Sequence, residues 1–158
     1  MSDSKIVKYA EDSVIISEGE KIDKMFKVVS GGVAIYLNYG KENEYLVGVL
    51  TEKRHFGEEG LLSDKPSVFT AIAFEETHLM AIGASEFEDY LRNNYQNMLS
   101  IMRDMSEKIT TLKANLNLLD NELKAGIQRE EFKKKSKELV LSRYSAFASA
   151  LHRFNSNS

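Results

Sequence analysis

Cysteine is absent from this chain of 158 residues, and no apolar run approaches the roughly 18 residues that a membrane-spanning helix requires. The lack of cysteine excludes disulfides, thiol catalysis and cysteine-ligated iron–sulfur clusters. The lack of a long apolar run predicts no membrane span, and the polar start, Met-Ser-Asp-Ser-Lys, is unlike a secretory signal. We therefore expect a cytoplasmic protein.

Patterns that would indicate catalysis or metal binding are also missing. The three histidines, His55, His78 and His152, are scattered and lack the spacing of metal ligands. The sequence contains no Walker-type phosphate loop, no paired-carboxylate pattern and no nucleophile beside a general base. We expect neither an enzyme nor a bound metal.

The charge of the chain is distributed unevenly. Residues 126–158 hold seven Lys or Arg against three acidic residues, whereas the whole chain has a net charge of −3. The preceding residues are therefore acidic, which makes them a poor surface for nucleic acid. We interpret the basic segment as a solvated helix face rather than a DNA site.

Short β-rich runs broken by turn residues occupy the chain from Val14 to Gly83, a pattern typical of a sandwich or barrel. Val33, Ile35 and Leu37 alternate with less apolar residues, which predicts one buried and one more exposed face. The expected strands are 14–17, 25–30, 33–39, 44–50, 67–73 and 77–83.

The periodicity then changes to that of a long helix. Ser85, with Glu88 three residues later, predicts a capping box at a helix start. A helix over 95–125 would be about 46 Å long at 1.5 Å per residue, more than a small barrel can cover. We therefore expect its heptad stripe to pair with a second copy, the alternative being a helix buried within one chain. The expected dimer interface consists of Met98, Met102, Met105, Ile109, Leu112, Leu116, Leu119 and Leu123.

Gly126 ends the stripe and predicts a helix C-cap or hinge. A second helix is expected over 129–154. Its broad apolar face consists of Phe132, Leu139, Val140, Tyr144, Phe147, Leu151 and Phe154. The sequence thus divides into a β-rich unit (1–94), a coiled-coil helix (95–125) and a hinge with a basic helix (126–158).

Residues 56–73 form the most informative segment, because Phe56-Gly57-Glu58 is followed by Gly60 and Leu61. This segment resembles the phosphate-binding cassette of cyclic-nucleotide-binding domains in Crp/Fnr-type sensors and kinase regulatory subunits. Residues 14–37 are similar to the opening strands of the same domain, and the resemblance extends over residues 6 to about 125. It implies a β-rich α+β fold, in which a jelly-roll β-roll is followed by a long dimerisation helix and a C-terminal helix.

The resemblance also implies a ligand site. In the family, the cassette glutamate accepts a ribose hydroxyl and a cassette arginine binds the phosphate; here Ser67 stands in place of that arginine. A neutral hydroxyl cannot replace a charged fork, since charge-assisted hydrogen bonds are about twice as strong, and we expect nearby Arg54 and Lys65 to point to solvent. The candidate ligand-binding residues are Phe56, Gly57, Glu58, Gly60, Leu61, Ser67, Val68 and Ser106, the last by similarity to the helix hydroxyls that reach the base.

We therefore expect a dimeric ligand-sensing module that resembles the effector domain of Crp/Fnr-family transcription regulators, with a degenerate cyclic-nucleotide pocket. It would bind a small-molecule effector and no cofactor; haem, known in some relatives, would need a histidine in the pocket, where His55 is the nearest. One alternative is a dimeric scaffold with an empty pocket, and another is a cyclic-nucleotide sensor with other phosphate ligands. No helix-turn-helix follows, so we expect no sequence-specific DNA binding by this chain alone.

Overall fold

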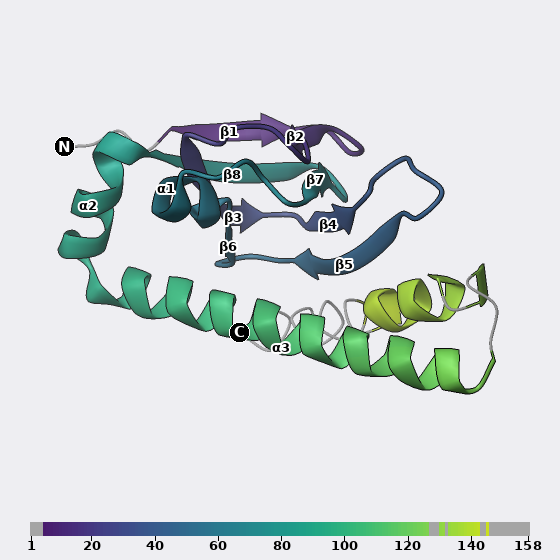
Figure 1. Ribbon diagram of the computed structural model, residues 1–158. Coiled ribbons are helices and arrows are strands. Elements are labelled where there is room, and N and C mark those ends of the chain that lie inside the picture. Colours follow the sequence, from purple (N-terminus) through teal and green to yellow (C-terminus); the bar gives the residue numbers. More distant parts are fainter. Residues whose placement is uncertain (1–4, 127–129, 132, 143–144, 146–158) are drawn as a thin grey trace, which may run out of the picture.

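The computed structural model of the chain describes residues 5–126, 130, 131, 133–142 and 145. Within them, two four-stranded antiparallel sheets share one core, with the strand orders β1-β8-β3-β6 and β2-β7-β4-β5 (Figure 1). The strands are β1 (Ile6–Tyr9), β2 (Val14–Ile16), β3 (Lys24–Ser30), β4 (Val33–Leu37), β5 (Tyr45–Leu50), β6 (His55–Phe56), β7 (Thr70–Ala73) and β8 (Thr77–Gly83). The expected β-roll is confirmed.

Apolar side chains from both sheets fill the space between them. Phe26 of β3 stacks on Phe56 of β6 with ring centroids 5.3 Å apart, and both rings are buried. Val33 of β4 and Leu79 of β8 belong to the same cluster and are fully buried. This continuous apolar core holds the two sheets in a fixed relation, because burial of such side chains is the main favourable contribution to folding.

Each strand that the alternation predicted is present, with ends shifted by up to three residues. β1 and β6 were not predicted: β1 is an edge strand with no fully buried residue, and β6 is too short to show a periodicity. Ala34 is buried although the pattern placed it on the more exposed face. Its short side chain lies on the central strand β4, between Val49 of β5 and Ile72 of β7.

Three helices are bounded within the described residues: α1 (Glu58–Ser63), α2 (Ala84–Asn93) and α3 (Tyr95–Lys124). The predicted capping box at Ser85 and Glu88 is wrong. The helix begins two residues earlier, after Gly83, whose backbone N–H donates to Glu86 Oε2 at 3.1 Å. Glu88 instead pairs with Arg92 one turn later on the exposed face.

α3 extends along one side of the β-roll, close to the predicted bounds (Figure 1). It begins after Asn94, whose side chain accepts the backbone N–H of Gln96 at 3.0 Å. Near its start, Ile101 packs with Met25 and Ile82 in a second buried cluster. Most of the apolar stripe stays exposed in the single chain: Met98, Met102, Met105, Ile109, Leu112, Leu116 and Leu123 are exposed, and Leu119 is partly buried.

Beyond α3, Gly126 adopts a left-handed backbone with φ 73°, which favours glycine and allows the chain to change direction. Helical residues 130–131 and 133–142 lie beside α3 (Figure 1). The Ser136 hydroxyl donates to the Tyr45 hydroxyl of β5 at 2.8 Å, which fixes this segment against the roll. Of the predicted apolar face, Phe132, Tyr144, Phe147, Leu151 and Phe154 lie outside the described residues.

No helix in the described part of the chain combines the length and apolar character that crossing a membrane would need.

Candidate ligand-binding site

A cavity of about 650 Å³ lies between β4, β5, the start of α1 and the middle of α3. Its volume falls within the range of roughly 300–1,000 Å³ that is usual for small-molecule sites. The apolar lining side chains are Ile35, Leu37, Val47, Val49, Leu50, Val68, Phe69, Met105, Ile109, Leu112, Leu139 and Val140. The last two come from the segment after α3, so three separate parts of the chain enclose the cavity.

A second hollow, of about 720 Å³, lies between the β4–β5 turn and residues 130–137. Charged side chains line much of it, and it does not include the Phe56-Gly57-Glu58 cassette. The cavity beside α3 is therefore the better candidate for a ligand site.

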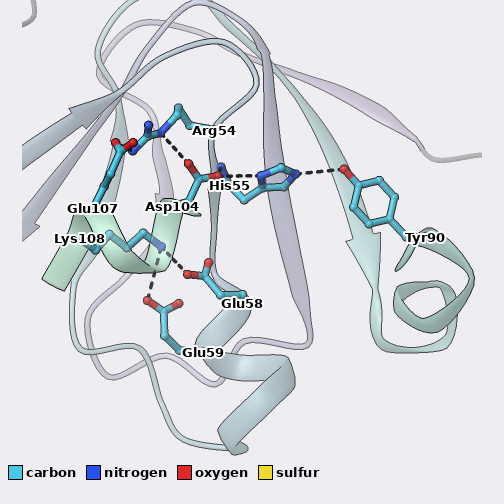
Figure 2. Close-up of polar contacts among 8 residues, drawn as sticks. All are labelled: Arg54, His55, Glu58, Glu59, Tyr90, Asp104, Glu107 and Lys108. Carbon is cyan, nitrogen blue, oxygen red and sulfur yellow. Dashed lines mark hydrogen bonds and ion pairs between the residues drawn. The ribbon is translucent and has the colours of Figure 1, made fainter. Parts of the chain in front are cut away.

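The cassette glutamate, Glu58, is the first residue of α1 and is 1% exposed. Gly57 before it has φ 82°, a left-handed backbone that lets the chain turn sharply from β6 into the helix. Glu58 Oε1 accepts a hydrogen bond from Lys108 Nζ of α3 at 2.6 Å (Figure 2). The same ammonium group lies 3.9 Å from Glu59 Oε1. A lysine of the long helix thus neutralises the carboxylate at the base of the cavity.

Lys108 was not among the candidates from the sequence. A signal was nevertheless present, because Lys108 lies seven residues after Ile101 and four after Asp104. Residues at these spacings share one face of a helix. Since Ile101 is a core residue, that face is the one that α3 turns toward the roll.

A second polar network joins β6, α2 and α3 around Asp104, which is 2% exposed. Asp104 Oδ2 accepts the backbone N–H of His55 at 2.9 Å and lies 2.8 Å from the ring Nδ1 of His55. Asp104 Oδ1 lies 2.8 Å from Arg54 Nε, and Arg54 also pairs with Glu107. The expectation that Arg54 points to solvent is wrong, because α3 presents two carboxylates to it.

The other ring nitrogen of His55, Nε2, lies 3.0 Å from the Tyr90 hydroxyl of α2 (Figure 2). Burial, followed by the charge of Asp104, raises the pKa of Tyr90 to about 12, so the phenol keeps its proton at neutral pH. A neutral imidazole satisfies both contacts when Nδ1–H donates to Asp104 and Nε2 accepts the phenol proton. Both ring nitrogens of His55 are thereby engaged, which does not fit a haem ligand.

Other titratable groups give no sign of a metal centre. In the part of the chain that the structure describes, no group of three or more His, Cys, Asp or Glu side chains could hold a metal ion. Burial, followed by the neighbouring charge of Glu58, raises the pKa of Glu59, while Lys108 opposes this shift. The site is an apolar cavity with a few paired charges at one end.

Of the eight candidate ligand residues, Glu58 and Val68 line this cavity. Phe56 belongs to the core, and Leu61 packs against the cluster around Met25. Gly60 lies against Ile22, where an added Cβ would come within 2.5 Å of the Ile22 Cβ. The structure therefore gives Gly60 a packing role, because any side chain there would clash.

The two candidate hydroxyls do not line the cavity in this chain. Ser67 is buried, and its Oγ donates to the carbonyl of Phe69 at 2.8 Å, which closes a local turn. Its backbone N–H also donates to the carbonyl of Glu20 at 2.8 Å. Ser106 is exposed on α3. Contacts from these two residues to a ligand remain predictions.

Comparisons with known proteins agree with this fold. The family model described as "Cyclic nucleotide-binding domain" matches residues 6–94, more than half of the chain. The cAMP-dependent protein kinase regulatory subunit of Candida albicans is 26% identical over 129 residues, which cover 82% of this chain and 27% of that protein. The chain thus spans about a quarter of the length of this relative.

Two solved structures show the same fold. The c-di-GMP responsive global regulator CLP of Xanthomonas campestris is 17% identical with a TM-score of 0.67, covering 74% of this chain and 59% of that one. A mutant of CooA from Carboxydothermus hydrogenoformans is also 17% identical, with a TM-score of 0.62, covering 73% of this chain and 49% of that one.

Proposed function

This chain belongs to the cyclic nucleotide-binding domain family, and from that premise we propose that it is a regulatory module that senses a small molecule in the cavity beside α3. In the finer form of the proposal, the module is a cytoplasmic dimer with a degenerate cyclic-nucleotide pocket. It resembles the effector domains of Crp/Fnr-family transcription regulators and is not itself an enzyme.

The observation that carries the proposal is the pair of contacts between the cavity and α3. Lys108 binds Glu58 at the base of the cavity, and Asp104 binds the backbone of His55, two residues before the cassette glycine (Figure 2). A ligand that reaches Glu58 or displaces Lys108 would change the contacts that hold α3. Sensing requires such a differential affinity for two placements of an element.

The segment after α3 supplies an output for such a change. Leu139 and Val140 line the cavity, while Ser136 is bound to Tyr45. An occupant would therefore touch the roll, α3 and this segment together. In the proposed mechanism, the units 1–94, 95–125 and 126–158 act as sensor, dimer helix and output.

The exposed stripe on α3 supports the proposed dimer. Its apolar residues recur at heptad spacing over most of the helix, and a large exposed apolar face marks an interaction surface. By resemblance to the Crp/Fnr family, the two copies of α3 would pair in parallel across a two-fold axis.

The scaffold alternative rests on the same ion pair. Lys108 already fills the neighbourhood of Glu58, and Ser67 supplies no charge for a phosphate. A cavity closed by its own side chains could serve only to hold α3 in place for a partner.

Native mass spectrometry of the protein purified from the cells that express it separates the two. A sensor should carry a small molecule bound in up to one copy per chain. Gly48→Phe should abolish this adduct, because Gly48 lines the cavity and an added Cβ there meets no atom within 4 Å. Leu62→Phe, on the exposed side of α1, is the control and should keep it. An adduct-free wild type, or an adduct that survives Gly48→Phe, contradicts the proposal.

A further inference from the structure

The cavity beside α3 carries more negative than positive charge. Among the described residues that line it, the acidic ones are Glu52, Glu58, Glu59 and Glu107. The two lining cations, Arg54 and Lys108, are both already bound by carboxylates. An incoming anion would therefore meet no free cation among these lining residues, and would have to compete with carboxylates for the existing ones.

Glu58 leaves one carboxylate oxygen without a partner. Its Oε1 accepts from Lys108, whereas Oε2 is buried and has no hydrogen-bond partner in the described part of the chain. A buried acceptor without a donor is unfavourable, and more so when the group is charged. The raised pKa of Glu59, caused by burial and then by Glu58, reflects the same excess of negative charge. The base of the cavity thus lacks a hydrogen-bond donor.

A complementary group lies further along the same wall. Asn115 also lines the cavity, and its Nδ2 is a buried donor without a partner among the described residues. Asn115 follows Lys108 by seven residues, about 10 Å along the helix at 1.5 Å per residue. Apolar side chains of β4, β5 and α3 separate the two polar ends.

Building on the proposed sensing function, we propose that the cavity takes an elongated apolar molecule with an amine, or another hydrogen-bond donor, at the end that meets Glu58. The head group donates to Glu58 Oε2. A carbonyl or hydroxyl oxygen roughly 10 Å away accepts from Asn115 Nδ2. The ligand is therefore a cation or a neutral donor, and an anionic phosphate is disfavoured, because like charges repel strongly in a poorly solvated site.

Three probes with one apolar body and different head groups test the charge preference: 4-phenylbutylamine, 4-phenylbutan-1-ol and 4-phenylbutyrate. Each is titrated into the full chain, and the methyl NMR signals of the lining Leu, Ile and Val residues report binding. The amine should bind more tightly than the carboxylate by about tenfold or more, the range for a hydrogen bond to a charged group. The alcohol should fall between them.

The outcomes distinguish this inference from the proposed function. If the carboxylate or cyclic AMP binds in the cavity as tightly as the amine, the inferred ligand class is wrong and the sensing function stands. If none of the probes nor cyclic AMP shifts the lining methyl signals, both are wrong.

A matched pair of substitutions then tests the contact with Glu58. Glu58→Gln should reduce the preference for amine over carboxylate to about twofold or less, since the charged acceptor is gone. Glu52→Gln removes the same charge from an exposed lining residue and should keep most of the preference. Equal effects of the two variants would attribute the preference to overall charge and overturn the assigned contact. The wild-type titrations decide the charge preference even if Glu58→Gln fails to fold.

Discussion

Lys108 donates to Glu58 across 50 residues of sequence, and this contact joins the middle of α3 to the first residue of α1. Glu58 is 1% exposed at its side chain and Lys108 23%, so the pair is largely withdrawn from water. An ion pair in such a position couples the cassette to the helix, because neither charge can be left alone without a large cost.

The first prediction concerns this pair. Lys108→Met should lower the free energy of unfolding by about 3 kcal/mol, since it leaves the buried Glu58 carboxylate without its counter-ion. Adding Glu58→Gln should recover part of the loss, because no unpaired charge then remains. Urea unfolding at one fixed protein concentration measures both. Lys113→Met, at an exposed position of α3, should change stability by no more than about 0.5 kcal/mol. A Lys108→Met variant as stable as this control would show that the pair does not form.

The second prediction concerns Asp104. Asp104→Asn should lower the free energy of unfolding by about 2–4 kcal/mol, because His55 and Arg54 lose a shared buried carboxylate. Asp120→Asn makes the same chemical change at an exposed ion pair with Lys124 and should cost less than about 1 kcal/mol. Thermal or urea unfolding of the two variants compares them directly. Equal stabilities would mean that the network contributes nothing.

The third prediction concerns oligomeric state. The wild-type chain should scatter light as a dimer of roughly twice 17.9 kDa, because the stripe on α3 is exposed in one chain. Leu116→Lys combined with Leu123→Lys should give a monomer, since buried unpaired ammonium groups would oppose pairing. Neither residue lines the ligand cavity. Leu62→Lys, on α1, is the control and should remain dimeric. A wild-type monomer at micromolar concentration would refute the dimer.

The fourth prediction concerns pH. The pKa of Glu59 is raised above its ordinary value of 4.5, chiefly by burial, so the folded chain holds this proton more tightly than the unfolded chain does. Stability from this group is therefore lost as pH rises from about 4.5 through the folded-state value. Glu59→Gln removes that loss and should melt at a higher temperature than wild type at pH 7. Below about pH 4 the difference should vanish, because Glu59 is then protonated in both states.

Calorimetric melting of wild type and Glu59→Gln between pH 3.5 and pH 8, on the order of the window set by that pKa, measures the difference curve. Glu52→Gln serves as the control at an exposed position. A Glu59→Gln variant that is less stable than wild type at pH 7 would mean that its contact with Lys108 outweighs the cost of burial.

The sequence by itself determined the features that depend on local order. The heptad spacing predicted α3 to within one residue at its end, because a helix needs only the repeat along its own length. The alternation of Val33, Ile35 and Leu37 predicted β4 for the same reason. The Phe56-Gly57-Glu58 pattern located the turn into α1, where glycine alone adopts the required backbone without strain.

The tertiary structure decided which polar groups meet. No repeat along the chain connects Lys108 with Glu58 or Asp104 with His55, since each contact depends on where α3 crosses the roll. The same holds for Ser67, whose hydroxyl is taken by its own turn, and for Gly60, which is fixed by the nearness of Ile22. Local periodicity specifies an element and its buried face. The partners of its polar side chains follow only when distant segments pack together, because hydrogen bonds and ion pairs act over a few ångströms.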